Sequence, residues 1–432
     1  MMDNSGRRRR NAIKLVGVAA AATTLLAMAG CASNSGGDTS ADGDVTIEFA
    51  QWWEPELGDG QFRGLMDQFE QENPGITVDL VSGPYASTKE QLFAGAASGT
   101  MPDVVGLDGA WVSDFAKQGV IADLSELMSS AGYDESQLAS QIKIDGSTYM
   151  IPVINFVYPM FTNDGLLSQA GVSAPPSTRT EFADAAEKIT ALGGDVSGWV
   201  LPLSLEAPNG VQNDVMSWVW ASGGSMLNDG KPDLTNDDVA SATDYIQQLW
   251  DDGVIAPGSF TMKEQDKVEE FTNGRVGMMI DSLAHINLIR ESNPDLAFSI
   301  SAIPAEDGFT GERGIPYASW GIGVAENSEH KDAAFKLVQF LMGKDVNSEL
   351  STMAKAFPGN TESVPTFVED DELFQTAFEI YKAGYPANEF TGLPVAEELM
   401  RQFGEQFQSA LDGQQSMDDA LKKSQDEWTS EF

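Results

Sequence analysis

The stretch Val45-Thr-Ile-Glu-Phe49 alternates apolar and polar residues, which is typical of a strand with one buried face. From Phe62 to Phe69 the apolar residues recur at i, i+3, i+4 and i+7, the spacing of one helix face, and Asn73-Pro-Gly75 ends that pattern. Alternation then resumes from Ile76 to Leu80. A strand, a helix and a second strand in this order predict a parallel sheet and an α/β fold.

Ahead of this unit lies an export signal. An apolar run opens behind Arg7-Arg-Arg-Arg10 and Lys14 and closes at Cys31, the one cysteine of the chain. Leu26-Ala-Met-Ala-Gly-Cys31 resembles a bacterial lipobox, with Met28 where a leucine is usual, and the resemblance implies that the thiol is acylated. We predict a lipoprotein signal peptide over 1–30, a flexible tether over 31–44, and a protein held by lipid on the extracellular face of the cell membrane.

Composition narrows the possible functions. The 432 residues carry a formal net charge of −41, which argues against binding to nucleic acid and against direct docking to anionic lipid heads. Removal of the leader leaves 402 residues, a length that suits two domains rather than one. With only His285 and His330, the chain offers little for histidine–metal or Ser–His chemistry, so we expect neither a metal nor a cofactor.

Several short motifs follow one another in a fixed order. Taken together they resemble bacterial extracellular solute-binding proteins, in the branch that includes maltose-binding protein and other carbohydrate receptors of ABC importers. The first three are similar to the N-terminal lobe of that family, the fourth to its first crossing between lobes, and the last to a signature strand. They are Phe69-Glu-Gln-Glu-Asn-Pro-Gly-Ile76, Ala97-Ser-Gly-Thr-Met-Pro-Asp-Val-Val105, Gly119-Val-Ile-Ala-Asp-Leu124, Gly146-Ser-Thr-Tyr-Met-Ile-Pro152 and Phe271-Thr-Asn-Gly-Arg-Val-Gly-Met-Met-Ile280.

The resemblance implies a two-lobed fold of the periplasmic-binding-protein type II class. Each lobe would be a mostly parallel sheet flanked by helices, and hinge strands would join the lobes. The implied N-terminal lobe takes residues 45–152 and 304–342, and the C-terminal lobe takes 153–303 and 343–432. The implied hinges lie near Ile151 to Ile154 and Ile300 to Ile303.

The same resemblance implies a monomeric receptor that closes on a carbohydrate and delivers it to the permease subunits of an ABC transporter. Few Lys or Arg residues stand among the candidate site residues, which favours a neutral oligosaccharide without singling out one sugar. Another class stays open: a secreted, lipid-anchored glycosidase, because glycosidases use a carboxylate pair and the chain has 66 Asp and Glu. The leader also leaves open whether export is by the Sec or the twin-arginine route.

Sugars present hydroxyl edges and apolar C–H faces, so a sugar site needs carboxylates or amides together with aromatic rings. In the first lobe such residues follow predicted strands, where open parallel sheets bind their ligands. Core packing is the alternative for the tryptophans, ordinary loop exposure for the tyrosine, and helix capping for the aspartate. We predict ligand-binding roles here for Trp52, Trp53, Glu54, Tyr85, Asp108 and Trp111.

A second group of candidates lies in the second lobe and at the return crossing. On a helix the indoles of Trp218 and Trp220 diverge, so one of them belongs in the core, and we favour Trp218 for the site. We further predict that Trp53, Trp218 and Trp320 form an aromatic platform for the sugar. The ligand-binding predictions of this group are Glu206, Asn213, Trp218, Asp281, Ser282 and Trp320; no residue is predicted to be catalytic.

Overall fold

The computed structural model describes residues 44–57, 60–369 and 371–432. The predicted signal peptide, the proposed lipid site Cys31 and the tether up to residue 43 lie outside these residues. Within them, no helix has the length and the apolar character that a membrane crossing requires.

The first sheet grows out of the strand–helix–strand unit. Its order is β13-β5-β12-β3-β1-β2, with β14 paired to β12 and β4 paired to β5. Strands β1 and β2 run parallel, from Val45 opposite Ile76 to Gln51 opposite Ser82, so the predicted unit is confirmed. The strands are β1 (Val45–Gln51), β2 (Ile76–Ser82), β3 (Val104–Leu107), β4 (Ile142–Ile144), β5 (Ser147–Val157), β12 (Gly314–Val324), β13 (Phe357–Pro358) and β14 (Tyr385–Ala387).

A second, four-stranded sheet has the order β11-β6-β10-β7. Its strands are β6 (Met160–Asn163), β7 (Ser197–Trp199), β10 (Val276–Ile280) and β11 (Phe298–Ser301). β6 is antiparallel to both of its neighbours, while β10 and β7 are parallel, so this sheet is mixed and not mostly parallel as the resemblance implied. A separate hairpin joins β8 (Leu227–Asn228) to β9 (Lys231–Pro232).

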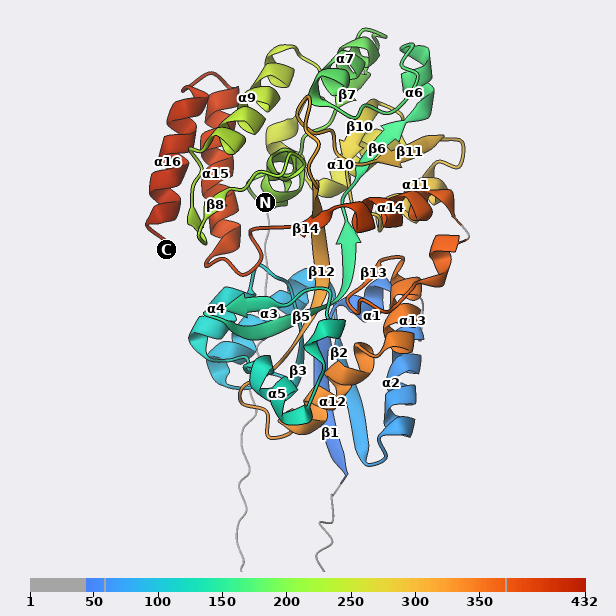
Figure 1. Ribbon diagram of the computed structural model, residues 1–432, viewed down its shortest axis with the longest axis vertical. Coiled ribbons are helices and arrows are strands. Elements are labelled where there is room, and N and C mark those ends of the chain that lie inside the picture. The colour runs from blue at the N-terminus through green and yellow to red at the C-terminus, as the bar shows by residue number, and fades with distance from the viewer. Residues whose placement is uncertain (1–43, 58–59, 370) are drawn as a thin grey trace, which may run out of the picture. The chain divides into compact units, whose positions relative to one another are not determined.

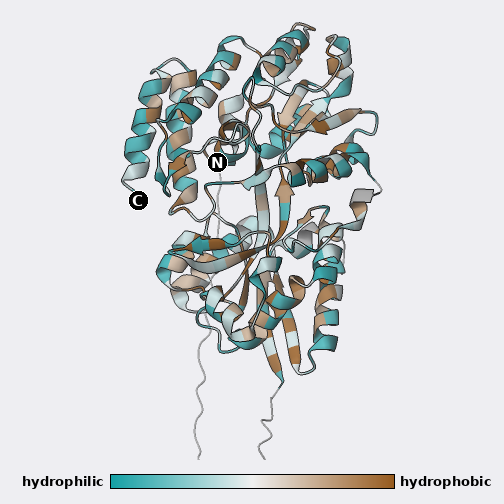
Figure 2. Ribbon diagram, in the orientation of Figure 1, coloured by the Kyte–Doolittle hydropathy of each residue, from teal (hydrophilic) through white to brown (hydrophobic). Residues whose placement is uncertain are grey.

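Helices cover both sheets, and Figure 2 shows teal and brown residues mixed along them, as amphipathic helices require. Those that bury side chains with the first sheet are α1 (Trp53–Glu56), α2 (Gln61–Glu72), α3 (Tyr85–Ser98), α4 (Val112–Gln118), α5 (Leu124–Ala131), α12 (Lys331–Leu341) and α13 (Lys344–Ala354). Those that bury side chains with the second sheet are α6 (Asp164–Gln169), α7 (Arg179–Thr190), the π-helix η2 (Val211–Met216), α8 (Ser217–Trp220), α9 (Asp237–Asp251), α15 (Ala396–Leu411) and α16 (Met417–Thr429).

A third apolar cluster lies where the chain crosses between the sheets. It contains Val157 at the end of β5, Phe161 on β6 and Tyr317 on β12. Helices α10 (Glu264–Thr272), α11 (His285–Ser292) and α14 (Glu372–Ala383) add side chains to it, as does the short helix η4 (Thr366–Glu369). The remaining 3-10 turns are η1 (Glu135–Gln137) and η3 (Ser259–Thr261).

The crossings themselves are short. β5 and β12 pair antiparallel from Val157 opposite Tyr317 to Ile151 opposite Ile322, and Figure 1 shows them running side by side. The chain leaves the first sheet after Val157 and enters the second at Met160; it returns between Ser301 and Gly314. Ile151 to Ile154, one of the implied hinges, lies in the paired part of β5 within the first core.

Local signals account for several helix starts. Thr178 accepts a hydrogen bond from the backbone N–H of Glu181, and the Glu181 carboxylate accepts one from the backbone N–H of Thr178, which forms a capping box ahead of α7. Asn236 and Ser416 cap α9 and α16 in the simpler manner, each through its side-chain oxygen. These caps fix where the helices begin and therefore which face each one buries.

Candidate functional site

A cavity of about 1270 Å³ lies between segments of the first and second sheets. This volume exceeds the range of about 300–1,000 Å³ that is usual for a small-molecule site. Seven of the twelve sequence-predicted ligand residues line it: Trp52, Tyr85, Asp108, Glu206, Asn213, Ser282 and Trp320. The other five, Trp53, Glu54, Trp111, Trp218 and Asp281, lie outside its lining.

Aromatic rings form one wall. Trp52, at the end of β1, packs edge-on against Tyr85 with ring centroids 5.3 Å apart, and against Trp111 at 5.7 Å. Tyr85, at the start of α3, is 38% exposed, whereas Trp111 is buried behind both rings. Trp52 and Tyr85 therefore present ring surface to the cavity, and Trp111 holds them in place.

Trp53 and Trp320 form a stacked pair. Their ring centroids are 5.5 Å apart and their planes are 5° from parallel, but only Trp320 lines the cavity. Trp53 is fully buried against Phe49 and Phe62. Next to Trp320, β12 carries a register shift at Gly321, where an added Cβ would lie 2.1 Å from Cε of Met150. A larger residue at position 321 would therefore force the Met150 side chain to move.

Asp108 lies in the turn that precedes α4, but it is not the helix cap, because the N-cap of α4 is Trp111 and has no side-chain cap hydrogen bond. Asp108 Oδ1 accepts a hydrogen bond of 2.9 Å from the backbone N–H of Ala110, which closes the turn before α4. Its side chain also lines the cavity, where burial and, to a lesser degree, Glu397 raise the pKa of the carboxyl above its ordinary value. Glu54 instead hydrogen-bonds Ser82 at the ends of β1 and β2.

The opposite wall comes from helices and loops that pack with the second sheet. The π-helix η2 places Asn213 in the lining, where its Oδ1 accepts a hydrogen bond from Gln212. Glu206 lies at the mouth and forms an ion pair of 2.6 Å with Lys263. Amide and carboxylate groups on this wall therefore face the aromatic wall, which is the combination that a sugar requires.

Trp218 does not line the cavity. It is fully buried in the second core, with ring centroids 4.9 Å from Phe182, 5.6 Å from Trp199 and 5.2 Å from Tyr245. The predicted platform of Trp53, Trp218 and Trp320 is therefore not brought together: only Trp320 faces the cavity. The rings that do line it with Trp320 are Trp52, Tyr85, Phe156 and Tyr158.

A buried ionic chain lies beneath the second wall. Lys267 Nζ is 3.2 Å from Oδ2 of Asp214, 3.5 Å from Oδ1 of Asp281, and donates to the carbonyl of Ile280. Burial alone would lower the pKa of Lys267, but the two carboxylates raise it, so the ammonium stays charged. Asp281 Oδ2 accepts from His285 Nδ1 at 2.8 Å, and His285 lines the cavity.

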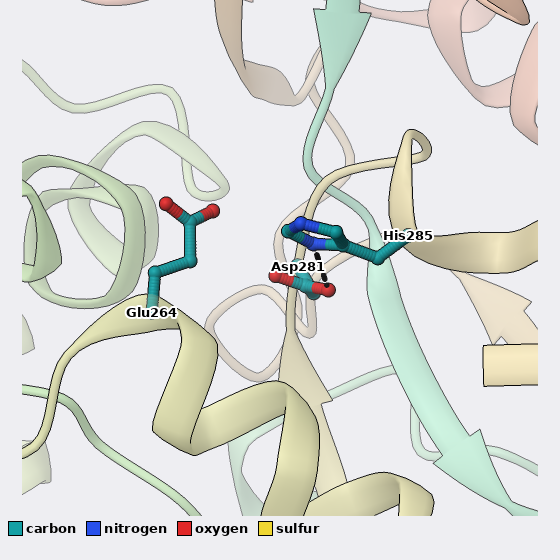
Figure 3. A group of neighbouring side chains, drawn as sticks. All are labelled: Glu264, Asp281 and His285. Atoms are coloured by element: carbon teal, nitrogen blue, oxygen red, sulfur yellow. Dashed lines mark hydrogen bonds and ion pairs between the residues drawn. The ribbon is translucent and has the colours of Figure 1, made fainter. Parts of the chain in front are cut away.

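Glu264, Asp281 and His285 offer oxygen and nitrogen atoms within 4.8 Å of one another, a spacing that suits a metal ion (Figure 3). Two features of the same residues disfavour one. The Lys267 ammonium already neutralises Asp281, and the imidazole nitrogen nearest Asp281 is a hydrogen-bond donor, so it offers no lone pair. The expectation that the chain holds no metal stays a prediction.

Sequence reasoning missed several lining residues. Lys89 on α3 forms an ion pair of 2.5 Å with Glu397 on α15, a pair separated by 308 positions that no local spacing reveals. Tyr158 lies in the first crossing, one residue beyond β5. His285 was the one with a signal, because it begins the helix that follows the predicted site residue Asp281.

The chain matches known proteins over most of its length. Residues 54–348 match the family model described as bacterial extracellular solute-binding protein. A protein of Brucella abortus (strain 2308) described as a binding protein is 31% identical over 307 residues, which are 70% of this chain and 73% of that protein. The galactooligosaccharide-binding protein of Bacillus subtilis (strain 168) is 24% identical over 327 residues, 74% of each.

Among solved structures, the cyclic alpha-maltosyl-1,6-maltose binding protein from Arthrobacter globiformis has the same fold. It superposes with a TM-score of 0.77 at 22% identity, over 90% of this chain and 99% of that one. The two sheets with a cavity between them thus define a periplasmic-binding-protein fold of type II, as the sequence predicted.

The chain belongs to the bacterial extracellular solute-binding protein family. Its members bind a solute outside the cell rather than transform it. Membership decides between the two classes that the sequence left open, in favour of a binding protein over a glycosidase.

Proposed function

We propose that this protein is the carbohydrate receptor of an ABC importer, that it acts as a monomer, and that its ligand is a neutral oligosaccharide. The lining of the cavity carries the proposal: Trp52, Tyr85 and Trp320 contribute aromatic rings, while Asp108 and Asn213 contribute hydrogen-bonding groups. The galactooligosaccharide-binding relative supports the choice of ligand class, and the motif resemblance to receptors of ABC importers supports the partner.

Both lysines among the described lining residues have partners, which supports a neutral ligand. Lys89 pairs with Glu397, and Lys355 has its ammonium 5.3 Å from the centre of the Phe367 ring. Acidic side chains such as Glu264 face the cavity as well. A phosphate or carboxylate group would therefore meet more negative than positive charge.

The crossings between the sheets support closure by hinge motion, but they place the hinges at other residues than the resemblance implied. We propose hinges at residues 158–159 and 302–313, where the chain passes between the sheets, rather than inside the paired part of β5. We also propose that the segment 343–356 belongs to the first lobe rather than the second, because Leu350 and Ala356 are buried in the first core.

A thermal-shift screen tests the function. Maltotriose, β-1,4-galactotriose and raffinose form the neutral set, with glucose 6-phosphate and galacturonate as charged controls. At least one neutral sugar should raise the melting temperature by mass action, and that sugar should reduce the radius of gyration in small-angle scattering at the mass of one chain. A screen in which only the charged sugars stabilise the protein would contradict the proposal.

Trp320→Ala should weaken binding of the sugar found in the screen by roughly thirtyfold, about 2 kcal/mol, because a ring that faces a ligand loses its contacts on truncation. Isothermal calorimetry measures the loss. Trp250→Ala is the matched control, since Trp250 packs on Phe260 and does not line the cavity. Equal affinity in the two variants would show that Trp320 does not contact the sugar.

Cys31→Ser should release the protein from the membrane into the medium. We propose the lipid anchor from the lipobox alone, and loss of the thiol removes the atom that would be acylated. Fractionation of cells with an immunoblot measures the distribution, and Ala32→Ser, one residue later, is the control that should stay in the membrane fraction. Retention of the Cys31→Ser protein without detergent would refute the anchor.

A further inference from the structure

A line of charged side chains runs from the core of the second sheet to the cavity. It begins at Asp214 on η2, continues through Lys267 on α10 and Asp281 at the end of β10, and ends at His285 on α11. Asp214, Lys267 and Asp281 are all buried, whereas the side chain of His285 is 22% exposed and lines the cavity. A buried carboxylate thus orients an imidazole that the solute can reach.

The hydrogen bond at Nδ1 decides what the imidazole can do. Asp281 and Lys267 form an ion pair, so the Asp281 carboxylate is ionised and can only accept, and His285 Nδ1 is the donor. No partner for Nε2 is found among the described residues. A neutral ring in this tautomer would offer Nε2 as an acceptor, whereas a protonated ring donates from it.

The charges around the ring favour the protonated form. Burial and Lys267 oppose it, but Asp281 and, more weakly, Glu264 outweigh them and raise the pKa of His285 to about 9. Asp214 lies on the far side of Lys267, and Tyr158 on the crossing is held neutral because burial raises the pKa of its hydroxyl. The imidazole is therefore an imidazolium at neutral pH.

Glu264 supplies the complementary group. It is the first residue of α10, lines the cavity, and accepts a hydrogen bond of 2.9 Å from Asn209 Nδ2 through one oxygen. A ring nitrogen of His285 lies within 4.8 Å of its carboxylate, and Figure 3 shows the imidazole next to Asp281 with the Glu264 carboxylate at its side. Donor and acceptor that each sit about 2.8 Å from one tetrahedral oxygen are about 4.6 Å apart.

We propose that His285 is a specificity-determining residue of the solute site, which together with Glu264 binds a single hydroxyl group of the solute. His285 donates to the hydroxyl oxygen and Glu264 accepts its proton. The proposal rests on the proposed function, since a carbohydrate is the solute class rich in such groups. An ether oxygen could satisfy only His285, and an anionic oxygen would be repelled by Glu264, so the pair selects hydroxyl over both.

The protonation state can be measured without any ligand. The chain has two histidines, so each gives one Cε1–H signal in a histidine-selective NMR spectrum, and His330→Gln assigns them. The His285 signal should titrate near pH 9, and Asp281→Asn should shift the midpoint toward the ordinary value of about 6.5. A wild-type midpoint near the ordinary value would overturn the proposal, because the neutral ring has no proton left to donate to the solute.

The hydroxyl contact is tested with the sugar that gives the largest thermal shift among maltotriose, β-1,4-galactotriose and raffinose. His285→Gln and Glu264→Gln should each bind it about tenfold to a hundredfold more weakly, as expected for a hydrogen bond to a charged group. His330→Gln should bind it normally. His285→Lys keeps a cationic donor and should lose less than His285→Gln, which separates the lost donor from altered folding.

Failure of this proposal differs from failure of the receptor function. If the wild type binds a sugar and His285→Gln binds it equally well, the carbohydrate receptor stands and the role of His285 is overturned. If no sugar in the set stabilises the wild type, the receptor function fails, and the NMR titration still decides whether His285 is a donor in the cavity.

Discussion

Trp218→Ala should lower the free energy of unfolding by about 3–5 kcal/mol, the usual cost of truncating a fully buried tryptophan. The indole is surrounded by Phe182, Trp199 and Tyr245, so its removal leaves a void in the second core. Urea-induced unfolding followed by tryptophan fluorescence measures the change. Sugar affinity of the folded variant should match the wild type, because Trp218 does not line the cavity.

The contrast with Trp320→Ala makes this result decisive. Trp320 lines the cavity, so its truncation should cost affinity, whereas Trp218 should cost only stability. Trp218→Phe, which keeps an aromatic ring in the same space, should recover part of the lost stability. If Trp218→Ala unfolds like the wild type but does not bind sugar, Trp218 is a ligand-binding residue and not a core residue.

Lys267→Met should lower the free energy of unfolding by about 3–5 kcal/mol at pH 8, because it leaves the buried Asp214 carboxylate without its cation, while Asp281 keeps only His285. The loss should be smaller at pH 5. Burial already raises the pKa of Asp214 to about 7, above its unfolded value of about 3.9, and loss of the cation would raise it further. A carboxyl group shifted in that direction destabilises the fold more as pH rises through that window. Urea unfolding at the two pH values measures the difference.

Two variants serve as controls for the buried ammonium. Asp214→Asn added to Lys267→Met removes the carboxylate that has lost its cation and should recover part of the loss. Lys188→Met breaks an exposed i, i+4 pair with Asp184 and should change stability by less than about 1 kcal/mol. Equal, small losses for Lys267→Met and Lys188→Met would mean that the buried pair contributes no more than a surface pair.

The sequence alone was reliable where a structure depends on neighbours in the chain. The alternation of Val45–Phe49 and the helical spacing of Phe62–Phe69 became β1 and α2 with the expected faces buried, and Thr178 with Glu181 became a capping box. Backbone geometry sets the periods of 2.0 and 3.6 residues, so a pattern over ten residues is enough to define such an element.

Sequence periodicity did not predict burial correctly where a side chain packs against residues that are distant in the chain. Helical spacing places Lys267 on the same face of α10 as Phe271, but a lysine is expected to be exposed, and only the distant Asp214 and Asp281 explain why it is buried. Ahead of Trp218, residues 211–216 form a π-helix, whose different period turns side chains away from the faces that an α-helix would give them. Neither the buried lysine nor the direction of Trp218 can be read from neighbouring residues.

The sequence by itself determined the type II two-sheet fold, the family, and the residue types of a sugar site at strand ends. Only the tertiary structure decided which tryptophans face the cavity, that Lys89 forms an ion pair with Glu397, and that His285 hydrogen-bonds Asp281. The physical reason is that the chain crosses between the sheets and returns, so each wall of the cavity is assembled from segments hundreds of residues apart. Local periodicity carries no information about which of those segments meet.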